Sequence, residues 1–215
     1  MNKKRTLLTV LAMVLVCALS VAGTLALLAE DSGPVTNTFV AASTGGDFVD
    51  NFEIKEYAIA PDGKGNYTLT NTETDANSYT VVPGVTLDKD AFVKLTRTNE
   101  TPAYLFIEVV NTLDSDVFTM DVDTQWGELA GVTGKYNGDV YVLGTAANPT
   151  VLNAVTDGKY HIISGNKVTV ADNNDLGITA GSTDTIKFYA YISQATVTKN
   201  GANTNVPADV FEICF

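Results

Sequence analysis

Hydrophobic and polar positions alternate with a period of two along several short stretches of this chain. Ile186, Phe188, Ala190 and Ile192 alternate with more polar neighbours, which predicts a strand with one apolar face turned inward. Residues 167–170 repeat the pattern. The run 103–110 is instead apolar on both faces, as in a central strand that is covered on both sides.

Turn-forming residues separate these runs. Glycine, proline, asparagine and aspartate gather at 61–66, 83–84, 99–102, 136–139, 157–158 and 164–166. Few windows have the three- and four-residue apolar spacing of a helix, so we expect short helices only at 87–92 and 207–211. The pattern predicts an all-β fold, with a single β-sandwich (jelly-roll-like) domain over residues 52–215 and short helices or loops between its strands.

The N-terminus has a different pattern. Basic residues at positions 3–5 precede a segment that has no charged residue until Glu30. A basic start followed by an apolar stretch is typical of an export signal, although this stretch is also long enough to be a retained membrane anchor. Small residues over 20–26 offer cleavage sites. We therefore expect residues 1–26 to be a cleavable signal peptide that meets the membrane only during export.

The sequence around the end of this segment has a more specific pattern than that of a general export signal. Residues 23–40 read GTLALLAEDSGPVTNTFV, in which G-T-x-A, an acidic step and P-V-T-N-T-F follow one another. This order resembles the signature of the TasA/CalY (camelysin) family of exported Gram-positive proteins, which the dedicated signal peptidase SipW processes. Later segments are similar to the family in the same order, namely 79–84, 89–90, 103–110, Trp126, 140–143 and 187–195. The resemblance implies cleavage between Ala26 and Leu27.

The resemblance also implies a function. It suggests a secreted structural protein of the extracellular (biofilm) matrix or cell surface, with further copies or related matrix subunits as partners. The freed N-terminal segment, residues 27–51, would add as a strand to a neighbouring subunit and so build a fibre. The same segment is alternatively the first strand of its own domain. The candidate donor strand consists of Val35, Thr36, Asn37, Thr38, Phe39 and Val40, and it precedes a small, polar lead-in at 41–51.

The charge of the chain narrows the possible partners. There are 25 acidic and 13 basic residues, a formal charge of −12. Removal of the signal peptide takes away three basic residues and no acidic one, which leaves −15. This balance argues against nucleic acid as a partner, because phosphate binding needs clustered lysine and arginine. Such a charge also opposes close stacking of subunits, so we expect assembly to respond to salt, acid or divalent cations.

Catalytic and metal-binding motifs are missing from the sequence. The single histidine, His161, excludes sites with several histidines, and we expect it to be a structural or surface residue of a strand. No H-E-x-x-H or G-x-S-x-G occurs, so we expect no enzyme activity, including the protease activity linked to camelysins. We expect no cofactor. Aspartates at 114–116, 121–123 and 172–175 favour turns, with Ca²⁺ binding at these loops as the alternative.

Aromatic residues suggest an alternative function. A monomeric surface adhesin or a glycan- or protein-binding module would need some of the nine tyrosines to gather with Trp126 on one face. Tyrosine is also an ordinary residue of half-buried strands, so packing in the core is the simpler expectation. Cys214, the one cysteine beyond the export signal, is expected to be a small apolar residue of a last strand.

Overall fold

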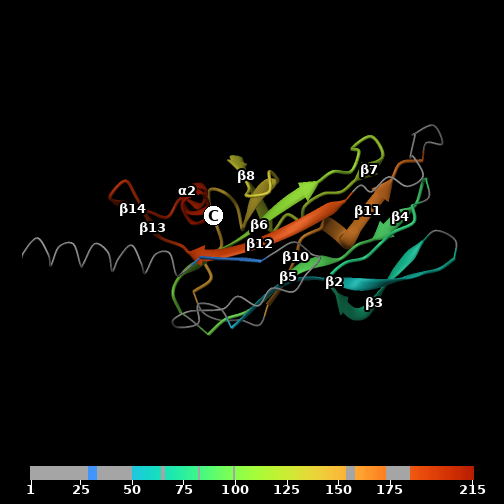
Figure 1. Cartoon of the computed structure of the whole chain (residues 1–215), viewed down its shortest axis with the longest axis horizontal. Helices are drawn as coiled ribbons and strands as arrows, with labels where there is room; N and C mark the ends of the chain where they lie inside the picture. The colour runs from blue at the N-terminus through green and yellow to red at the C-terminus, as the bar shows by residue number, and fades with distance from the viewer. Residues whose placement is uncertain are drawn as a thin grey trace, which may run out of the picture.

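The computed structural model describes residues 29–32, 50–63, 66–81, 83–98, 100–153, 158–172 and 185–215, with 29–32 placed by their backbone. This part of the chain consists mostly of antiparallel strands, with one short α-helix (Figure 1), so the expectation of an all-β fold is confirmed. The elements are β1 (Ala29–Ser32), β2 (Asn51–Pro61), β3 (Tyr67–Thr74), β4 (Thr86–Asp88), β5 (Ala91–Thr96), β6 (Ala103–Asn111), β7 (Phe118–Thr119), β8 (Trp126–Thr133), β9 (Asp139–Leu143), β10 (Gly158–His161), η1 (Ser164–Asn166), β11 (Lys167–Val170), β12 (Ile186–Gln194), β13 (Val197–Lys199), β14 (Ala202–Thr204) and α2 (Pro207–Cys214).

Two larger sheets carry most of these strands. One has the order β1-β12-β6-β9-β8 and the other the order β10-β5-β2-β3, and the smaller sheets are β4-β11-β7 and β13-β14. Strand β6 is central, since it pairs with β12 on one side and β9 on the other, and its residues are buried from Ala103 to Val109. The prediction of a strand covered on both faces is therefore confirmed for this run.

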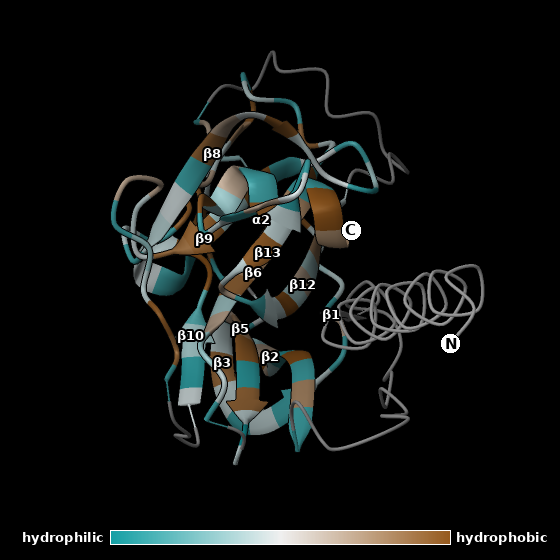
Figure 2. Ribbon diagram, turned by 90° about the vertical axis from the view of Figure 1, so that its left-hand side faces the viewer, coloured by the Kyte–Doolittle hydropathy of each residue, from teal (hydrophilic) through white to brown (hydrophobic). Residues whose placement is uncertain are grey.

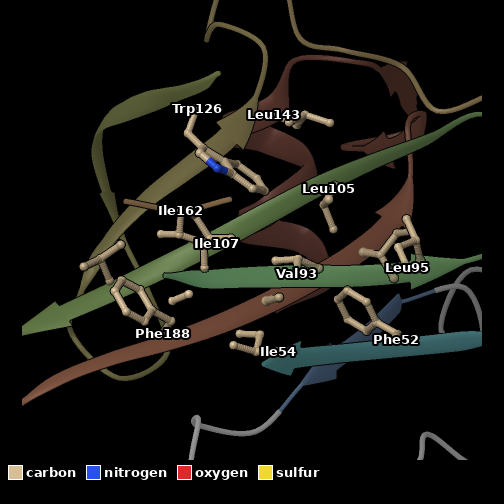
Figure 3. Packing of buried hydrophobic residues seen from close by; sticks show 14 of the residues in the cluster. Phe52, Ile54, Val93, Leu95, Leu105, Ile107, Trp126, Leu143, Ile162 and Phe188 are labelled. Carbon is tan, nitrogen blue, oxygen red and sulfur yellow. The ribbon is translucent and has the colours of Figure 1, made fainter. Parts of the chain in front are cut away.

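The main core lies between the two larger sheets. Leu105 and Phe188 from the five-stranded sheet meet Ile54 and Val93 from the four-stranded sheet in one buried cluster (Figure 3). The prediction that alternate residues of 186–192 face inward is confirmed, because Phe188, Ala190 and Ile192 all belong to this cluster. Period-two alternation thus places every second side chain of β12 in or against the main core.

The opposite face of the five-stranded sheet is buried as well. Tyr189 and Tyr191 of β12 pack there in a second cluster with Val210 and Phe211 of α2. Figure 2 shows α2 lying over this sheet, close to the labelled C-terminus. In β12 the alternation of polar and apolar residues predicts only the first of these two faces. The second face is not predicted because it carries tyrosines, whose apolar rings can be buried while their hydroxyls form hydrogen bonds.

The two predicted helices have different outcomes. The helix expected at 207–211 is confirmed as α2, which has Pro207 at its first position, where a missing N–H costs nothing. The helix expected at 87–92 is wrong, because this stretch forms β4 and the start of β5. Leu87 is buried in a small cluster under β11 and Ala91 in the main core, so packing in two different places overrides local spacing. Cys214 ends α2 and is not in a strand, which corrects that expectation.

Candidate functional site

Among the described residues, the two larger sheets have four edge strands. The five-stranded sheet ends in β1 and β8, and the four-stranded sheet ends in β10 and β3. An edge strand presents backbone N–H and C=O groups that can pair with another chain, and native proteins usually blunt such edges. The length and regularity of each edge strand therefore determine how well another chain can pair with it.

Strand β3 is interrupted by a bulge. Its register with β2 runs through Tyr57 opposite Glu73 and then Ile59 opposite Leu69, so β3 has two residues more than β2 between these pairs. The side chain of Asn77 fills the gap: its amide oxygen accepts the N–H of Ile59 at 3.2 Å, and its amide nitrogen donates to the carbonyl of Tyr57 at 2.8 Å. A bulged strand bends and loses the regular spacing that a partner strand needs.

Strand β8 is interrupted in the same way. Glu128 lies opposite Tyr141 and Thr133 opposite Asp139, so β8 has three residues more than β9 in this interval. Gly131 supplies a positive φ of 83° inside it. The irregular stretch leads into the turn between β8 and β9, which is fixed from below by a buried carboxylate.

That carboxylate belongs to Glu108, whose side chain is fully buried. Its Oε1 accepts the backbone N–H groups of Tyr136 at 2.7 Å and Gly138 at 2.9 Å, and its Oε2 accepts the Tyr191 hydroxyl at 2.5 Å. Three donors compensate for the removal of the carboxylate from water. The β8–β9 turn is thereby tied to β12, and the blunted edge is held in place.

Strand β10 is short and carries a lysine. It has four residues, and the Lys159 ammonium contacts Glu73 at 2.6 Å and the Tyr57 hydroxyl at 2.8 Å. The hydrogen bond from Lys159 holds the pKa of Glu73 below its usual value, although desolvation acts in the opposite direction, and Lys94 adds to the lowering. A short edge with a charged side chain is a poor template for a partner strand.

The edge formed by β12 is different. Its register with β6 is unbroken over all nine residues, from Ile186 to Gln194. Strand β1 pairs with only four of them, from Ala29 opposite Ser193 to Ser32 opposite Ala190 (Figure 1). Within the described residues, no strand pairs with 186–189 on this side. Beneath its short cover, β12 is therefore a longer and more regular strand than β3, β8 or β10.

The structure tests few of the site residues predicted from the sequence. Ala26, Leu27 and the candidate donor strand Val35–Val40 lie outside the described residues, as does the lead-in up to residue 49. Between them, residues 29–32 form β1 on the edge of their own sheet. Local alternation does not predict this strand, because Glu30 and Asp31 interrupt any apolar pattern there. The only signal was its position between the cleavage site and the donor strand.

His161 lies in β10, so the expected strand is confirmed. Its Nδ1 is 2.6 Å from a carboxylate oxygen of the buried Asp90. Its backbone carbonyl accepts hydrogen bonds from Trp126 Nε1 and Gln125 Nε2, both at 2.7 Å. These contacts join β10 to the five-stranded sheet, which supports the structural role that we expected for this histidine.

Trp126 lies in the core and is not part of an aromatic surface. Its side chain is only 5% exposed and points into the main core (Figure 3). Tyr104, Tyr189 and Tyr191 are buried too, so packing accounts for these rings. The expectation that aromatic residues pack in the core is confirmed for Trp126 and these three tyrosines.

The aspartate-rich loops form turns. A carboxylate oxygen of Asp114 accepts the N–H of Asp116 at 2.9 Å, and one of Asp123 accepts the N–H of Gln125 at 3.0 Å. These bonds confirm the turn-forming role of the first two loops, while residues 173–175 of the third lie outside the described part. Among the described residues, no three His, Cys, Asp or Glu side chains are grouped to hold a metal ion.

Comparisons with protein-family models, curated proteins and solved structures find no match for this chain. Within the described residues, no helix has the length and apolar character needed to cross a membrane.

Proposed function

We propose that this chain is a secreted structural protein of the extracellular (biofilm) matrix or cell surface. Its copies join into fibres when the mature N-terminal segment of one copy adds as a strand to the β12 edge of the next. The observation that carries the proposal is the contrast among the edges: β12 is long and regular, whereas β3 and β8 are bulged and β10 is short. The repeating body is a β-sandwich of the jelly-roll kind, supported by the core that the two larger sheets share.

The short cover of β12 supports an exchange between copies. A neighbour's residues 29–32 would form the same four pairs that the chain's own β1 forms, so replacement costs few contacts. If the neighbour's strand continues in the same register, residues that follow Ser32 pair with the free half of β12, which begins at Tyr189. In this register Val35 and Thr36, the first two residues of the donor strand, lie opposite Lys187 and Ile186 at the beginning of β12. Within the described residues no strand pairs with 186–189 on this side, so an added strand would form hydrogen bonds there.

This mode of addition produces an open chain of subunits. The donor segment and the β12 edge are different surfaces, so each copy gives a strand to one neighbour and receives one from another. Head-to-tail contacts of this kind form filaments unless their rotation closes a ring. The charge of −15 after cleavage keeps free subunits apart at low ionic strength, so salt should accelerate assembly.

Export would be coupled to assembly in this proposal. The signal peptidase cuts between Ala26 and Leu27, and until then the signal peptide holds the donor segment at the membrane. Cleavage releases the segment outside the cell, where neighbours are present. The fibre therefore forms only after secretion.

The experiment compares the mature chain with one that lacks residues 27–42. Negative-stain electron microscopy and sedimentation should find fibres for the first and single subunits for the second. A matched pair of point variants refines the test: Phe39→Asp lies in the donor strand and should block fibres, whereas Phe48→Asp lies in the lead-in and should not. Fibres of the same form from the shortened chain would contradict the proposal.

A further inference from the structure

Two Asn-Gly steps occur in the sequence, and both lie in turns that the structure describes. Asn137-Gly138 lies between β8 and β9, and Asn200-Gly201 lies between β13 and β14. Both asparagines are exposed and have a positive φ, 64° for Asn137 and 53° for Asn200. The exposure and the φ of the asparagine therefore do not distinguish the two steps.

An asparagine that precedes a glycine can lose its side-chain amide. The backbone nitrogen of the glycine attacks the side-chain carbonyl carbon, ammonia leaves, and a cyclic imide (succinimide) forms. Water then opens the imide at either carbonyl, which leaves aspartate or isoaspartate, so that water is consumed and no oxidant is needed. Glycine permits the attack because no side chain shields its nitrogen. The reaction therefore depends on whether this nitrogen is accessible and free of a hydrogen bond.

The nitrogen of Gly138 is held in place. It donates to a carboxylate oxygen of Glu108 at 2.9 Å, and both residues are buried. A Cβ placed on Gly138 would lie 2.6 Å from the carbonyl oxygen of Val109, so the glycine is closely packed. Attack by this nitrogen would break a buried hydrogen bond to a charged group, which opposes the reaction at Asn137.

The nitrogen of Gly201 has an open environment. Asn200 and Gly201 form a two-residue loop, because Lys199 pairs with Ala202, and both loop residues have a positive φ, as in a type I′ turn. Gly201 is exposed, and a Cβ placed on it would meet nothing within 4 Å. Among the described residues, none accepts a hydrogen bond from its N–H.

We propose that Asn200 is a site of spontaneous deamidation, whereas the Glu108 carboxylate protects Asn137. The same dipeptide thus has two outcomes in one chain, because only one of the two glycine nitrogens is buried and hydrogen-bonded. Either product at position 200 adds a carboxyl group to the tip of the hairpin. Isoaspartate also lengthens the backbone, because the chain then runs through the side-chain carbon.

Conversion of Asn200 changes the contact between the hairpin and α2. Lys199, the preceding residue, donates to Asp209 of α2 and contacts Glu212 at 3.3 Å, and the Thr204 hydroxyl donates to Asp209 at 3.0 Å. Figure 1 shows β13 and β14 beside this helix. A new carboxylate next to Lys199 competes with the two helix carboxylates for the ammonium group. The longer backbone of isoaspartate also departs from a two-residue type I′ loop, so the reaction loosens α2.

The experiment incubates the purified chain at mildly alkaline pH, where a backbone nitrogen loses its proton more readily. Peptide mass spectrometry measures the conversion of both asparagines. Asn200 should convert at least about tenfold faster than Asn137, because only Gly138 must first give up a hydrogen bond to a carboxylate. The matched control is the same chain unfolded in urea, where the two steps should convert at similar rates.

Equal rates in the folded chain, or a faster conversion of Asn137, would overturn the assignment. An Asn200 that stays unconverted in the folded chain but converts in urea would overturn it as well, since the hairpin would then protect the step. The reaction involves a single chain, so none of these outcomes depends on fibre formation.

A second readout tests the effect on α2. Anion exchange separates the converted chain, because it has one more negative charge than the unconverted chain. Hydrogen exchange over 207–214 should be up to about fivefold faster in the converted chain, as expected for the loss of an exposed ion pair. Exchange over 103–109 in β6 is the internal control and should be equal in both. Equal exchange over 207–214 would contradict the loosening of α2.

Discussion

The edge at β12 and the edge at β3 have opposite construction. Strand β12 keeps one register with its neighbour over nine residues, while β3 has two extra residues and an asparagine side chain that fills the gap in β2. Strand β8 resembles β3, with three extra residues and a turn anchored by Glu108. The chain thus blunts two edges permanently through its own sequence. The regular edge at β12 is covered, within the described residues, only by β1, a segment close to the predicted cleavage site.

This difference determines at which edge association can be controlled. A bulge is built into the fold and cannot be removed by processing. A short covering strand can leave, and it can be replaced by the same segment of another copy.

Shortened subunits should cap growing fibres. A chain that lacks residues 27–42 keeps the β12 edge but has no strand to donate. Mixed with the mature chain, it should therefore accept one strand and stop growth, so that average fibre length falls as its fraction rises. Electron microscopy gives the length distribution. Unchanged lengths at an equimolar ratio would mean that β12 does not receive the strand.

Straightening β3 should create a second association surface. Deletion of Asn71 and Thr72 removes the two extra residues and lets β3 pair regularly with β2. In a chain that also lacks 27–42, we expect a change from monomers to dimers or larger species, because a regular edge is a template. Light scattering after gel filtration measures this. A folded protein that stays monomeric would show that the bulge does not protect the edge.

Loosening the β8 side should cost stability but leave the β12 edge intact. Glu108→Gln retains the shape of the side chain but replaces one acceptor oxygen with an NH₂ donor. That donor would then face the N–H or O–H donors that the carboxylate accepts in the unaltered chain. We expect the free energy of unfolding to fall by about 2–3 kcal/mol. Urea denaturation measures the loss, and hydrogen exchange should rise at 134–138 more than at 190–193. A larger rise at 190–193 than at 134–138 would mean instead that Glu108 mainly stabilises β12.

The end of β3 should loosen in acid. Lys159 holds the pKa of Glu73 below its usual value of 4.5, so the ionised carboxylate stabilises the folded state. That contribution is complete above about pH 4.5 and is lost as the pH falls through the lowered pKa. The pair is partly exposed, so we expect under about 1 kcal/mol. Hydrogen exchange of β3 at pH 6 and pH 3 should differ less in Glu73→Gln, and also in Lys159→Gln. A full acid response in both variants would contradict this assignment.

Much of the strand pattern could be predicted from the sequence, because alternation is a local property. Residues 186–192 and 103–110 were assigned correctly on that basis. The bulges could not be predicted, since the register between β2 and β3 depends on both strands and on Asn77, which lies beyond them. The expected helix at 87–92 was wrong for a related reason: Leu87 and Ala91 pack in different clusters, which no local window reveals.

The candidate site was harder to predict than the fold. The sequence placed the donor at Val35–Val40, and that remains a prediction. It did not place β1, whose four residues pair with a strand at the other end of the chain. Pairing between such distant segments leaves no trace in local spacing. The distinction between β12 and the edges at β3 and β8 lies in the registers of paired strands, which the sequence alone does not reveal.

Cysteine pairing across the β1–β12 contact tests strand exchange most directly. Ala29 and Ser193 lie directly opposite each other, and the Cα atoms of such antiparallel pairs are about 4.5–5.5 Å apart, within reach of a disulfide. In a Cys214→Ser background, one chain carries Ala29→Cys and the other Ser193→Cys. The two are mixed, assembled and oxidised. The account predicts disulfide-linked pairs of the two chains in the fibres, and a double variant on one chain that cannot assemble until it is reduced. Fibres without any interchain disulfide, or oxidised double variants that still assemble, would contradict it.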